Sequence, residues 1–191
     1  MPDFRRISLT TDRLSLRPLQ TGDADALLAI FSDPEVMRYW NTPPWSSCQD
    51  AIDFIEQSHQ ALASKEQVIL GVYDRHSQQL LGKCLLFAYD VESRRAEIGF
   101  GLARQSWGKG YIQETGQALI RFGFEDLNLN RLEAEIDPAN TASGKALERL
   151  GFNREGLLRE RWIIDGQVSD SGLYGLLRSD WQATNTIPQE R

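Results

Sequence analysis

A loop with two glycines joins a strand pattern to a helix pattern near the middle of the chain. Residues 96–102 alternate as a strand does, and the segment from Tyr111 to Phe122 places apolar side chains on one helical face. The segment from Gln105 to Gly110 lies between them. The start of a helix exposes unpaired backbone N–H groups, and glycines let the backbone approach a bulky anion. The junction therefore predicts a pyrophosphate cradle, although an ordinary turn would have the same local pattern.

Two common nucleotide-binding loops fit this segment less well. The dinucleotide-binding fingerprint requires a third glycine where the chain has Gln113. The Walker loop requires Ser or Thr after its lysine, whereas Lys109 is followed by Gly110. By itself the junction therefore indicates an anion and not a particular nucleotide.

The patterns on either side of the junction predict the fold class. In chain order they indicate a strand, two helices, three strands, a helix, a strand, a helix and a hairpin. The strands fall at residues 14–19, 67–73, 80–89, 96–102 and 131–136, the helices begin near Asp23, Ser47, Tyr111 and Asn140, and the hairpin covers residues 161–177. Residues 33–45 are expected to form a loop. This order predicts an α+β fold of mixed αβ layers, with a central, mostly antiparallel twisted sheet flanked by helices, and not a doubly wound fold.

Size and composition narrow the classes of function. The chain has 191 residues, which suits one domain. Its formal net charge is -6, so we expect no nucleic-acid partner. We find no apolar segment long enough to span a membrane, so we expect no membrane partner and a cytoplasmic location. Cys48 and Cys84 fit no metal spacing, so we expect no metal, and Cys84 is expected to be buried. Residues 183–191 are polar and aperiodic, which predicts a loose C-terminal tail.

Several further motifs surround the glycine loop in a fixed order. They are Thr11-Asp12-Arg13-Leu14 with Leu16-Arg17, Asp33-Pro34-Glu35-Val36, Gln105-x-x-Gly108-x-Gly110, Trp107-Gly108-Lys109-Gly110-Tyr111 with Glu114, Asn130-Arg131-Leu132, Asn140-x-x-Ser143 and Leu150-Gly151-Phe152. In these motifs the chain resembles the GNAT family of N-acetyltransferases, and in particular its RimJ/RimL-like branch, which acetylates ribosomal proteins. The resemblance covers residues 8–180 and implies a single domain with the GNAT acyl-CoA N-acyltransferase fold.

The resemblance implies an acetyl-coenzyme A site at the glycine loop. The main-chain N–H groups near residues 107–111 would hold the pyrophosphate, and the pantetheine arm would pair with the backbone of residues 99–102. The implied cofactor-binding residues are Gly99, Phe100, Gly101, Leu102, Gln105, Trp107, Gly108, Lys109, Gly110, Tyr111, Asn140 and Ser143.

The same resemblance implies two catalytic residues. Glu97 lies on the strand before the loop, where several GNAT enzymes carry the carboxylate that removes the amine proton, often through water. The alternative is a solvent-facing carboxylate beside Arg94 and Arg95. Ser143 would donate a hydrogen bond or proton to the leaving sulfur, because Leu147 stands where many GNAT enzymes have a tyrosine. A helix-surface or capping residue is the alternative interpretation of Ser143, and an N-cap, which is compatible with cofactor binding, is the alternative for Asn140.

The acceptor site is expected between an aromatic loop and the closing hairpin. In this family Tyr39, Trp40 and Trp45 of the loop and Trp162 of the hairpin would contact substrate, and packing on the core is the alternative. The implied reaction transfers an acetyl group from acetyl-coenzyme A to a primary amine, with a protein N-terminus as the first candidate, by direct attack in a ternary complex. The alternatives are a small-molecule amine acetyltransferase (for a polyamine, amino-acid analogue or antibiotic) and a non-catalytic acyl-CoA-binding module. GNAT proteins are often dimers, so a homodimer is a further expectation.

Overall fold

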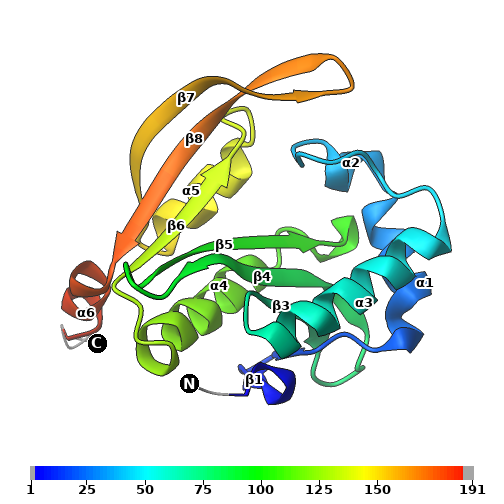
Figure 1. Ribbon diagram of the computed structural model, residues 1–191, viewed down its shortest axis with the longest axis horizontal. Coiled ribbons are helices and arrows are strands. Elements are labelled where there is room, and N and C mark those ends of the chain that lie inside the picture. Colours follow the sequence, from blue (N-terminus) through cyan, green and yellow to red (C-terminus); the bar gives the residue numbers. More distant parts are fainter. Residues whose placement is uncertain (1–2, 187–191) are drawn as a thin grey trace.

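The computed structural model describes residues 3–186, which are organised around one eight-stranded sheet. Its strands are β1 (Leu9–Thr10), β2 (Leu14–Arg17), β3 (Val68–Asp74), β4 (Leu80–Asp90), β5 (Arg95–Leu102), β6 (Arg131–Ile136), β7 (Asn153–Ile164) and β8 (Gln167–Leu177). They lie in the order β1-β2-β3-β4-β5-β6-β8-β7 (Figure 1). Every neighbouring pair is antiparallel except β5 and β6, which are parallel. The predicted α+β fold with a mostly antiparallel sheet is therefore confirmed.

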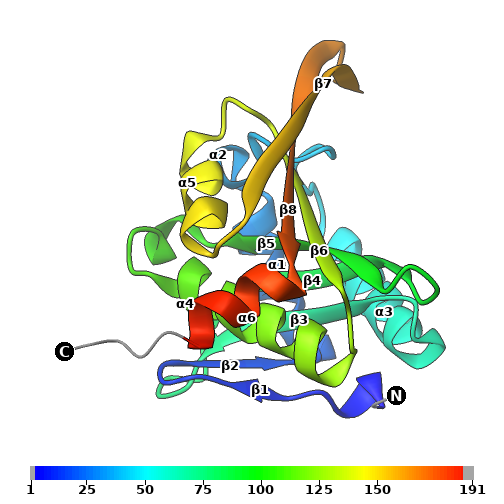
Figure 2. The ribbon, with the colours of Figure 1, turned by 90° about the vertical axis from the view of Figure 1, so that its left-hand side faces the viewer.

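Helices cover both faces of the sheet (Figure 1, Figure 2). They are α1 (Ala24–Phe31), α2 (Pro34–Met37), α3 (Cys48–Ser64), α4 (Tyr111–Arg121), α5 (Thr141–Arg149) and α6 (Arg178–Thr186). The helices α1, α2 and α3 contribute Leu27, Met37 and Ile55 to one buried apolar cluster. The helices α4 and α5 contribute Leu119 and Leu147 to the other. The strands β3 and β4 contribute side chains to both clusters, so this part of the sheet has an apolar layer on each face.

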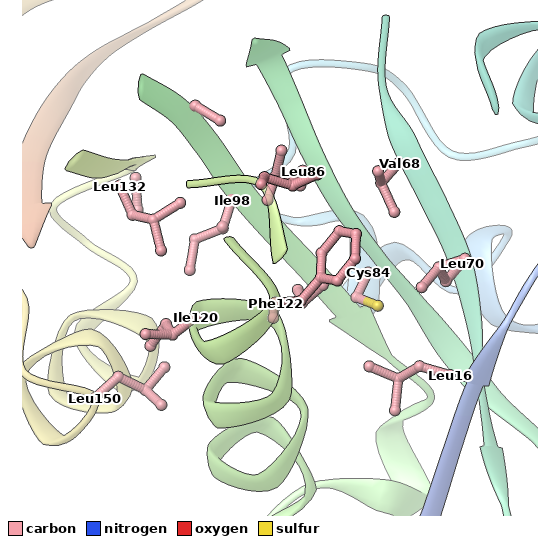
Figure 3. Close-up of a cluster of buried hydrophobic side chains, with 14 of the residues drawn as sticks. Leu16, Val68, Leu70, Cys84, Leu86, Ile98, Ile120, Phe122, Leu132 and Leu150 are labelled. Atoms are coloured by element: carbon pink, nitrogen blue, oxygen red, sulfur yellow. The ribbon is translucent and has the colours of Figure 1, made fainter. Parts of the chain in front are cut away.

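The larger cluster is built where α4 crosses the sheet. Figure 3 shows Ile120 and Phe122, from α4 and the π-helical turn that continues it, pointing toward Cys84 and Ile98 of β4 and β5. Cys84 is fully buried, as expected for a small apolar side chain. This packing fixes α4 against β5, and so it also fixes the loop between them.

Local signals set the ends of the helices as the sequence predicts. At the start of α3, the carboxylate of Asp50 accepts the backbone N–H of Ser47 at 2.9 Å, which completes a capping box. At the start of α5, the side chain of Asn140 accepts the N–H of Ser143 at 3.1 Å. After α5, Gly151 takes a φ of 95° and ends the helix.

The strands β5 and β6 separate soon after they meet. Their registered pairs are Arg95 with Arg131, Ala96 with Leu132 and Glu97 with Glu133. Beyond Glu97, β5 pairs with β4, and β6 pairs with β8. Figure 1 shows β6 turning away from β5 along this stretch. Within the described residues, β5 therefore has one edge without a strand partner from residue 98 onward.

Three expectations about element boundaries are wrong. Residues 34–37 form the short helix α2 within the predicted loop, because Asp33 caps its first turn by accepting the N–H of Glu35. The first strand of the hairpin begins at Asn153, not at residue 161, because its charged and exposed first half hides the alternation of an edge strand. Residues 183–186 of the expected loose tail belong to α6, and residues 187–191 lie outside the described part.

The turn between β7 and β8 has the type I′ conformation that an Asp-Gly pair favours. Asp165 and Gly166 have φ values of 48° and 77°, which is the pair of positive values that a type I′ turn requires.

Among residues 3–186, no helix has the length and apolar composition to cross a membrane.

Candidate active site

The glycine loop leads into a helix whose N-terminus has no side-chain cap. Gly108 and Gly110 have φ values of 70° and 79°, which side chains other than glycine rarely adopt. Gly110 is the N-cap of α4, and no side chain caps the first turn. The helix therefore presents its unpaired N–H groups and positive dipole end to the surface beside the loop. This geometry fits an anion such as a pyrophosphate.

The side chains of the glycine loop are mostly exposed, and one of them bonds to the end of β5. Gln105, Lys109 and Trp107 are exposed, and the Trp107 side chain leaves 48% of its surface open to solvent. The indole N–H of Trp107 donates to the carbonyl of Leu102 at 2.9 Å, which ties the loop to the end of β5. This bond uses one of the two acceptor positions of the Leu102 carbonyl oxygen.

An arginine from the N-terminal strand region holds the loop against α4. The Arg13 guanidinium forms an ion pair with Glu114 at 2.7 Å and donates to the Lys109 carbonyl at 2.9 Å. It also stacks over the Tyr111 ring, 4.7 Å from the centroid. Glu114 belongs to the motif that includes the glycine loop. Through its ion pair with Arg13, it connects α4 to the start of β2. The sequence did not single out Arg13 in this role.

The open edge of β5 runs from the glycine loop back to Glu97. Gly99 and Gly101 are on the same face of the strand as Glu97, because side chains alternate. A Cβ on Gly101 would lie 2.6 Å from Cζ2 of Trp40, so only glycine lets this ring pack on the strand. Phe100 points to the other face and packs against the larger core cluster.

Glu97 lies at the last registered pair before β5 and β6 separate. Its side chain is partly buried, and burial raises the pKa of the carboxyl group, with further contributions from the negative charges of Glu135 and Glu133. Hydrogen bonding by the backbone N–H of Glu135 and the positive charge of Arg161 oppose this effect, and the resulting pKa is about 7. A carboxylate with such a pKa can accept a proton near neutral pH.

Two acidic residues of β6 belong to this site and were missed by the sequence reasoning. Glu133 is paired with Arg95 at 3.0 Å and with Arg131 at 2.7 Å. Glu135 accepts hydrogen bonds from the closing hairpin instead. The alternation in residues 131–136 indicated that these carboxylates share a face, but the parallel pairing that brings them to Glu97 leaves no local signal.

The β7–β8 hairpin reaches the site through Glu135. The Trp162 indole N–H donates to Oε1 of Glu135 at 2.9 Å, and the Ser171 hydroxyl donates to the same oxygen at 2.6 Å. The Arg161 guanidinium lies 3.5 Å from it. Trp162, expected as a substrate contact, therefore bonds to a carboxylate whose charge acts on Glu97.

The first turn of α5 contains Asn140 and Ser143. Asn140 caps the helix, as the capping alternative expected, and Ser143 is partly buried. Leu147 is buried in the larger cluster with 1% of its surface exposed, so its position holds no proton donor. Among residues 3–186, no group of three or more His, Cys, Asp or Glu side chains is placed to hold a metal ion.

The aromatic loop closes around a lysine that the sequence reasoning did not flag. Lys83 of β4 has only 5% of its surface exposed. Its ammonium lies 4.9 Å from the ring centroids of both Trp40 and Trp45. Phe31 and Phe54 complete the surround at 4.1 and 3.9 Å. Trp40 and Trp45 therefore pack on the sheet around Lys83.

The remaining aromatic residue of this loop is Tyr39. Its ring lies under the Arg38 guanidinium, 5.4 Å from centroid to Cζ, and the side chain is partly exposed.

The only signal for Lys83 in the sequence is its position as a lone charge in the apolar run of residues 80–86.

Comparison with known proteins assigns this architecture to one family. Residues 13–153 match the acetyltransferase (GNAT) domain. The chain is 38% identical over 174 residues to the uncharacterized N-acetyltransferase p20 of Bacillus licheniformis, covering 91% of this chain and 98% of the relative. It is 28% identical over 185 residues to the ribosomal protein uS5-alanine N-acetyltransferase of Escherichia coli, covering 92% of this chain and 93% of that protein.

The fold agrees with these relatives. The crystal structure of a GNAT-family acetyltransferase from Bacillus anthracis superposes with a TM-score of 0.81 at 24% identity, covering 91% of this chain and 99% of that one. The chain therefore belongs to the GNAT family and is an acetyl-coenzyme A-dependent acetyltransferase.

Proposed function

We propose that the protein transfers an acetyl group to a primary amine by direct attack of the amine in a ternary complex. The observation that carries the proposal is the location of Glu97. It lies where β5 and β6 separate, on the strand that leads to the uncapped N-terminus of α4. A proton acceptor where the two strands separate and an anion-binding helix end after the same strand are the groups that this transfer needs.

The residues around the opening fit the donor. The backbone N–H groups at the start of α4 would hold the pyrophosphate, with Gly108 and Gly110 keeping the loop in its left-handed conformation. The free edge of β5 would pair with the amides of the pantetheine arm, as an added strand does. Bound in this way, acetyl-coenzyme A supplies a thioester as the acetyl donor.

Glu97 is the proposed base. An ammonium group has no lone pair, so the acceptor must lose a proton before its nitrogen can attack the carbonyl carbon. With a pKa of about 7, Glu97 can take that proton directly or through a water molecule. The N–C bond then forms as the C–S bond breaks, the attacking nitrogen loses its second proton, and the departing sulfur gains one to leave as the thiol. No enzyme nucleophile is required.

Ser143 is the proposed proton donor. It lies in the first turn of α5, and the bond from its N–H to Asn140 fixes the conformation of that turn. Its hydroxyl would donate to the sulfur as negative charge develops there. Buried Leu147 cannot serve in its place.

A protein N-terminus is the proposed acceptor. The Escherichia coli relative is named for acetylating an alanine of ribosomal protein uS5. An α-amino group ordinarily has a pKa of about 8, whereas a lysine side chain has one of about 10. A carboxylate whose pKa is about 7 deprotonates the first far more readily than the second. The chemistry of Glu97 therefore favours α-amines over lysine or polyamine amines.

An amine panel tests this proposal through thiol release from acetyl-coenzyme A. The panel contains peptides with free N-termini, N-terminally blocked lysine peptides, polyamines and amino-sugar antibiotics. We expect the free N-termini to react fastest. Glu97→Gln should lower kcat by about 100-fold or more, since general-base catalysis contributes on this scale. Ser143→Ala should lower kcat by roughly tenfold, which corresponds to the loss of about 1.4 kcal/mol, the size of one hydrogen bond to the sulfur.

Exposed Glu92 provides the matched control, because it lies in the turn between β4 and β5. Glu92→Gln should leave kcat unchanged. Equal rates for Glu97→Gln and the wild type would remove the base assignment. Faster turnover of polyamines or antibiotics would indicate a small-molecule acceptor. Binding of coenzyme A without thiol release for any amine would indicate a non-catalytic module.

A further inference from the structure

We propose that Glu135 is a positioning residue for the acetyl transfer, which ties the β7–β8 hairpin to Glu97 and sets the electrostatic surroundings of that carboxylate. The inference rests on the proposed role of Glu97 as the base. It assigns a role to a residue of β6 that no motif of the chain indicates.

The backbone of Glu135 acts on Glu97 directly. Registered pairing of β5 with β6 stops at Glu97 and Glu133, so the next part of β6 no longer bonds to the β5 backbone. The N–H of Glu135 instead faces the Glu97 side chain and favours its ionised form. Glu97 and Glu135 therefore lie close to each other where the two strands separate.

The side chain of Glu135 links the same point to the hairpin. Trp162 from β7 and Ser171 from β8 both donate to Oε1, at 2.9 and 2.6 Å. Ser171 is buried, with 1% of its surface exposed. Arg161 approaches the same oxygen at 3.5 Å. One carboxylate oxygen therefore gathers three contacts from two strands of the hairpin.

A bulge in β7 lies next to these contacts. Between the registered pairs Leu158 with Ser171 and Trp162 with Ser169, β7 carries residues 159–161 and β8 carries only Asp170. Glu160 has a φ of 51°, and its N–H donates to the Asp170 carboxylate at 2.8 Å. Bulges bend a strand locally. The bend falls directly before Trp162, where the hairpin extends past the end of β6 (Figure 1, Figure 2).

The charges that face Glu97 come from two neighbouring elements. On β6 they are Glu135 and Glu133, which oppose its ionisation, and on β7 it is Arg161, which favours it. On β4, the residue opposite Glu97 is the uncharged Phe87. Glu133 is neutralised by two arginines, whereas Glu135 has one arginine at a longer distance. Glu135 is therefore the group whose charge Glu97 feels most.

The substitution Glu135→Gln separates charge from structure. A glutamine keeps one carbonyl oxygen for Trp162 and Ser171, and it keeps the backbone N–H. Removing the negative charge makes ionisation of Glu97 easier. We expect the acid limb of the kcat profile to move about one pH unit lower, as expected for loss of a nearby like charge. Carboxyl carbon NMR of the cofactor-free protein should show the same shift for the resonance that is missing in Glu97→Gln.

The substitution Trp162→Phe tests the link to the hairpin. It removes the indole N–H and leaves the charge of Glu135 in place. We expect KM for the acceptor to rise several-fold while the acid limb keeps its wild-type position. A purely structural role for Trp162 would instead lower the unfolding temperature with no change in KM.

Glu155 and Glu97 provide the controls. Glu155 is also on the hairpin but pairs with Arg131, so Glu155→Gln should leave the acid limb unchanged. The proposal is overturned if Glu135→Gln leaves both the limb and the carboxyl resonance at their wild-type positions while Glu97→Gln abolishes the limb. If Glu97→Gln itself keeps the limb and the rate, the base assignment fails first and this inference fails with it.

Discussion

At the residue scale, Lys83 is the most unusual group of the molecule. It is almost fully buried, and the rings around it come from α1, α3 and the loop between α2 and α3. Burial lowers its pKa from 10.5 to about 7. The ring faces stabilise the ammonium by cation–π attraction and so offset part of the cost of burying a charge.

This environment predicts that stability depends on pH through Lys83. The unfolded chain keeps its proton up to about pH 10, whereas the folded protein releases it near pH 7. The unfolded state therefore binds more protons in between, and the free energy of unfolding should rise with pH across this range. The full effect corresponds to about 5 kcal/mol at most. Urea denaturation at a series of pH values measures it.

Lys83→Met keeps the length of the side chain and removes the charge. It should be more stable than the wild type at pH 6 and should lose the rise above pH 7. Lys145 is exposed on α5, so Lys145→Met should follow the wild-type curve. Identical curves for Lys83→Met and the wild type would mean that the ammonium is solvated in solution.

At the element scale, the conformation at the start of α4 depends on a residue near the N-terminus of the chain. Arg13 joins the Lys109 carbonyl, the Tyr111 ring and Glu114, so it holds both the loop and the first turn of the helix. The guanidinium side chain is about half exposed, which limits the strength of the ion pair. We propose that Arg13 holds the backbone N–H groups of the loop and first turn in their binding positions in the absence of the anion, which lowers the entropy cost of binding.

Arg13→Ala should therefore weaken coenzyme A binding by roughly tenfold, or about 1.4 kcal/mol, as measured by calorimetry. Gly108→Val should weaken it at least as much, because valine disfavours a φ of 70°. Arg5 pairs with Asp3 on the exposed N-terminal turn, so Arg5→Ala is the control and should bind normally. Normal affinity in Gly108→Val would contradict the assignment of the cradle.

At the scale of the whole molecule, the sheet consists of two parts with a narrow junction. The strands β1 to β5 form one part and β6, β8 and β7 form the other, and the registered pairs between them end at Glu97. A ligand in the opening would contact both parts and would stabilise the folded state by mass action, by about 2.7 kcal/mol at 100 times Kd.

Hydrogen exchange can locate this effect. On addition of coenzyme A, amides in residues 98–102 of β5 and in residues 108–113 should exchange more slowly, because they gain partners. Amides of β3, which is paired on both sides, should be unchanged. Protection confined to the first three helices would place the ligand away from the edge of β5 and the start of α4, and would contradict the proposed site.

Much of the fold could be read from local patterns. The alternation of β5 and β6, the capping of α3 and α5, and the left-handed glycines of the loop all depend on neighbours in the sequence. The first half of β7 could not be read in this way. It is exposed at the edge of the sheet and is defined by its partner β8 rather than by its own pattern.

The sequence by itself determined the glycine loop, the helix that follows it and the family motifs, because backbone dihedrals and periodicity are properties of short segments. Only the tertiary structure decided that the charges of Glu135 and of Arg161 from the hairpin act on Glu97, and that Lys83 lies among four rings. These contacts join residues from strands and helices far apart in the chain. They exist because β6 lies between β5 and β8 and because α1 and α3 pack on β4, and neither arrangement is encoded by adjacent residues.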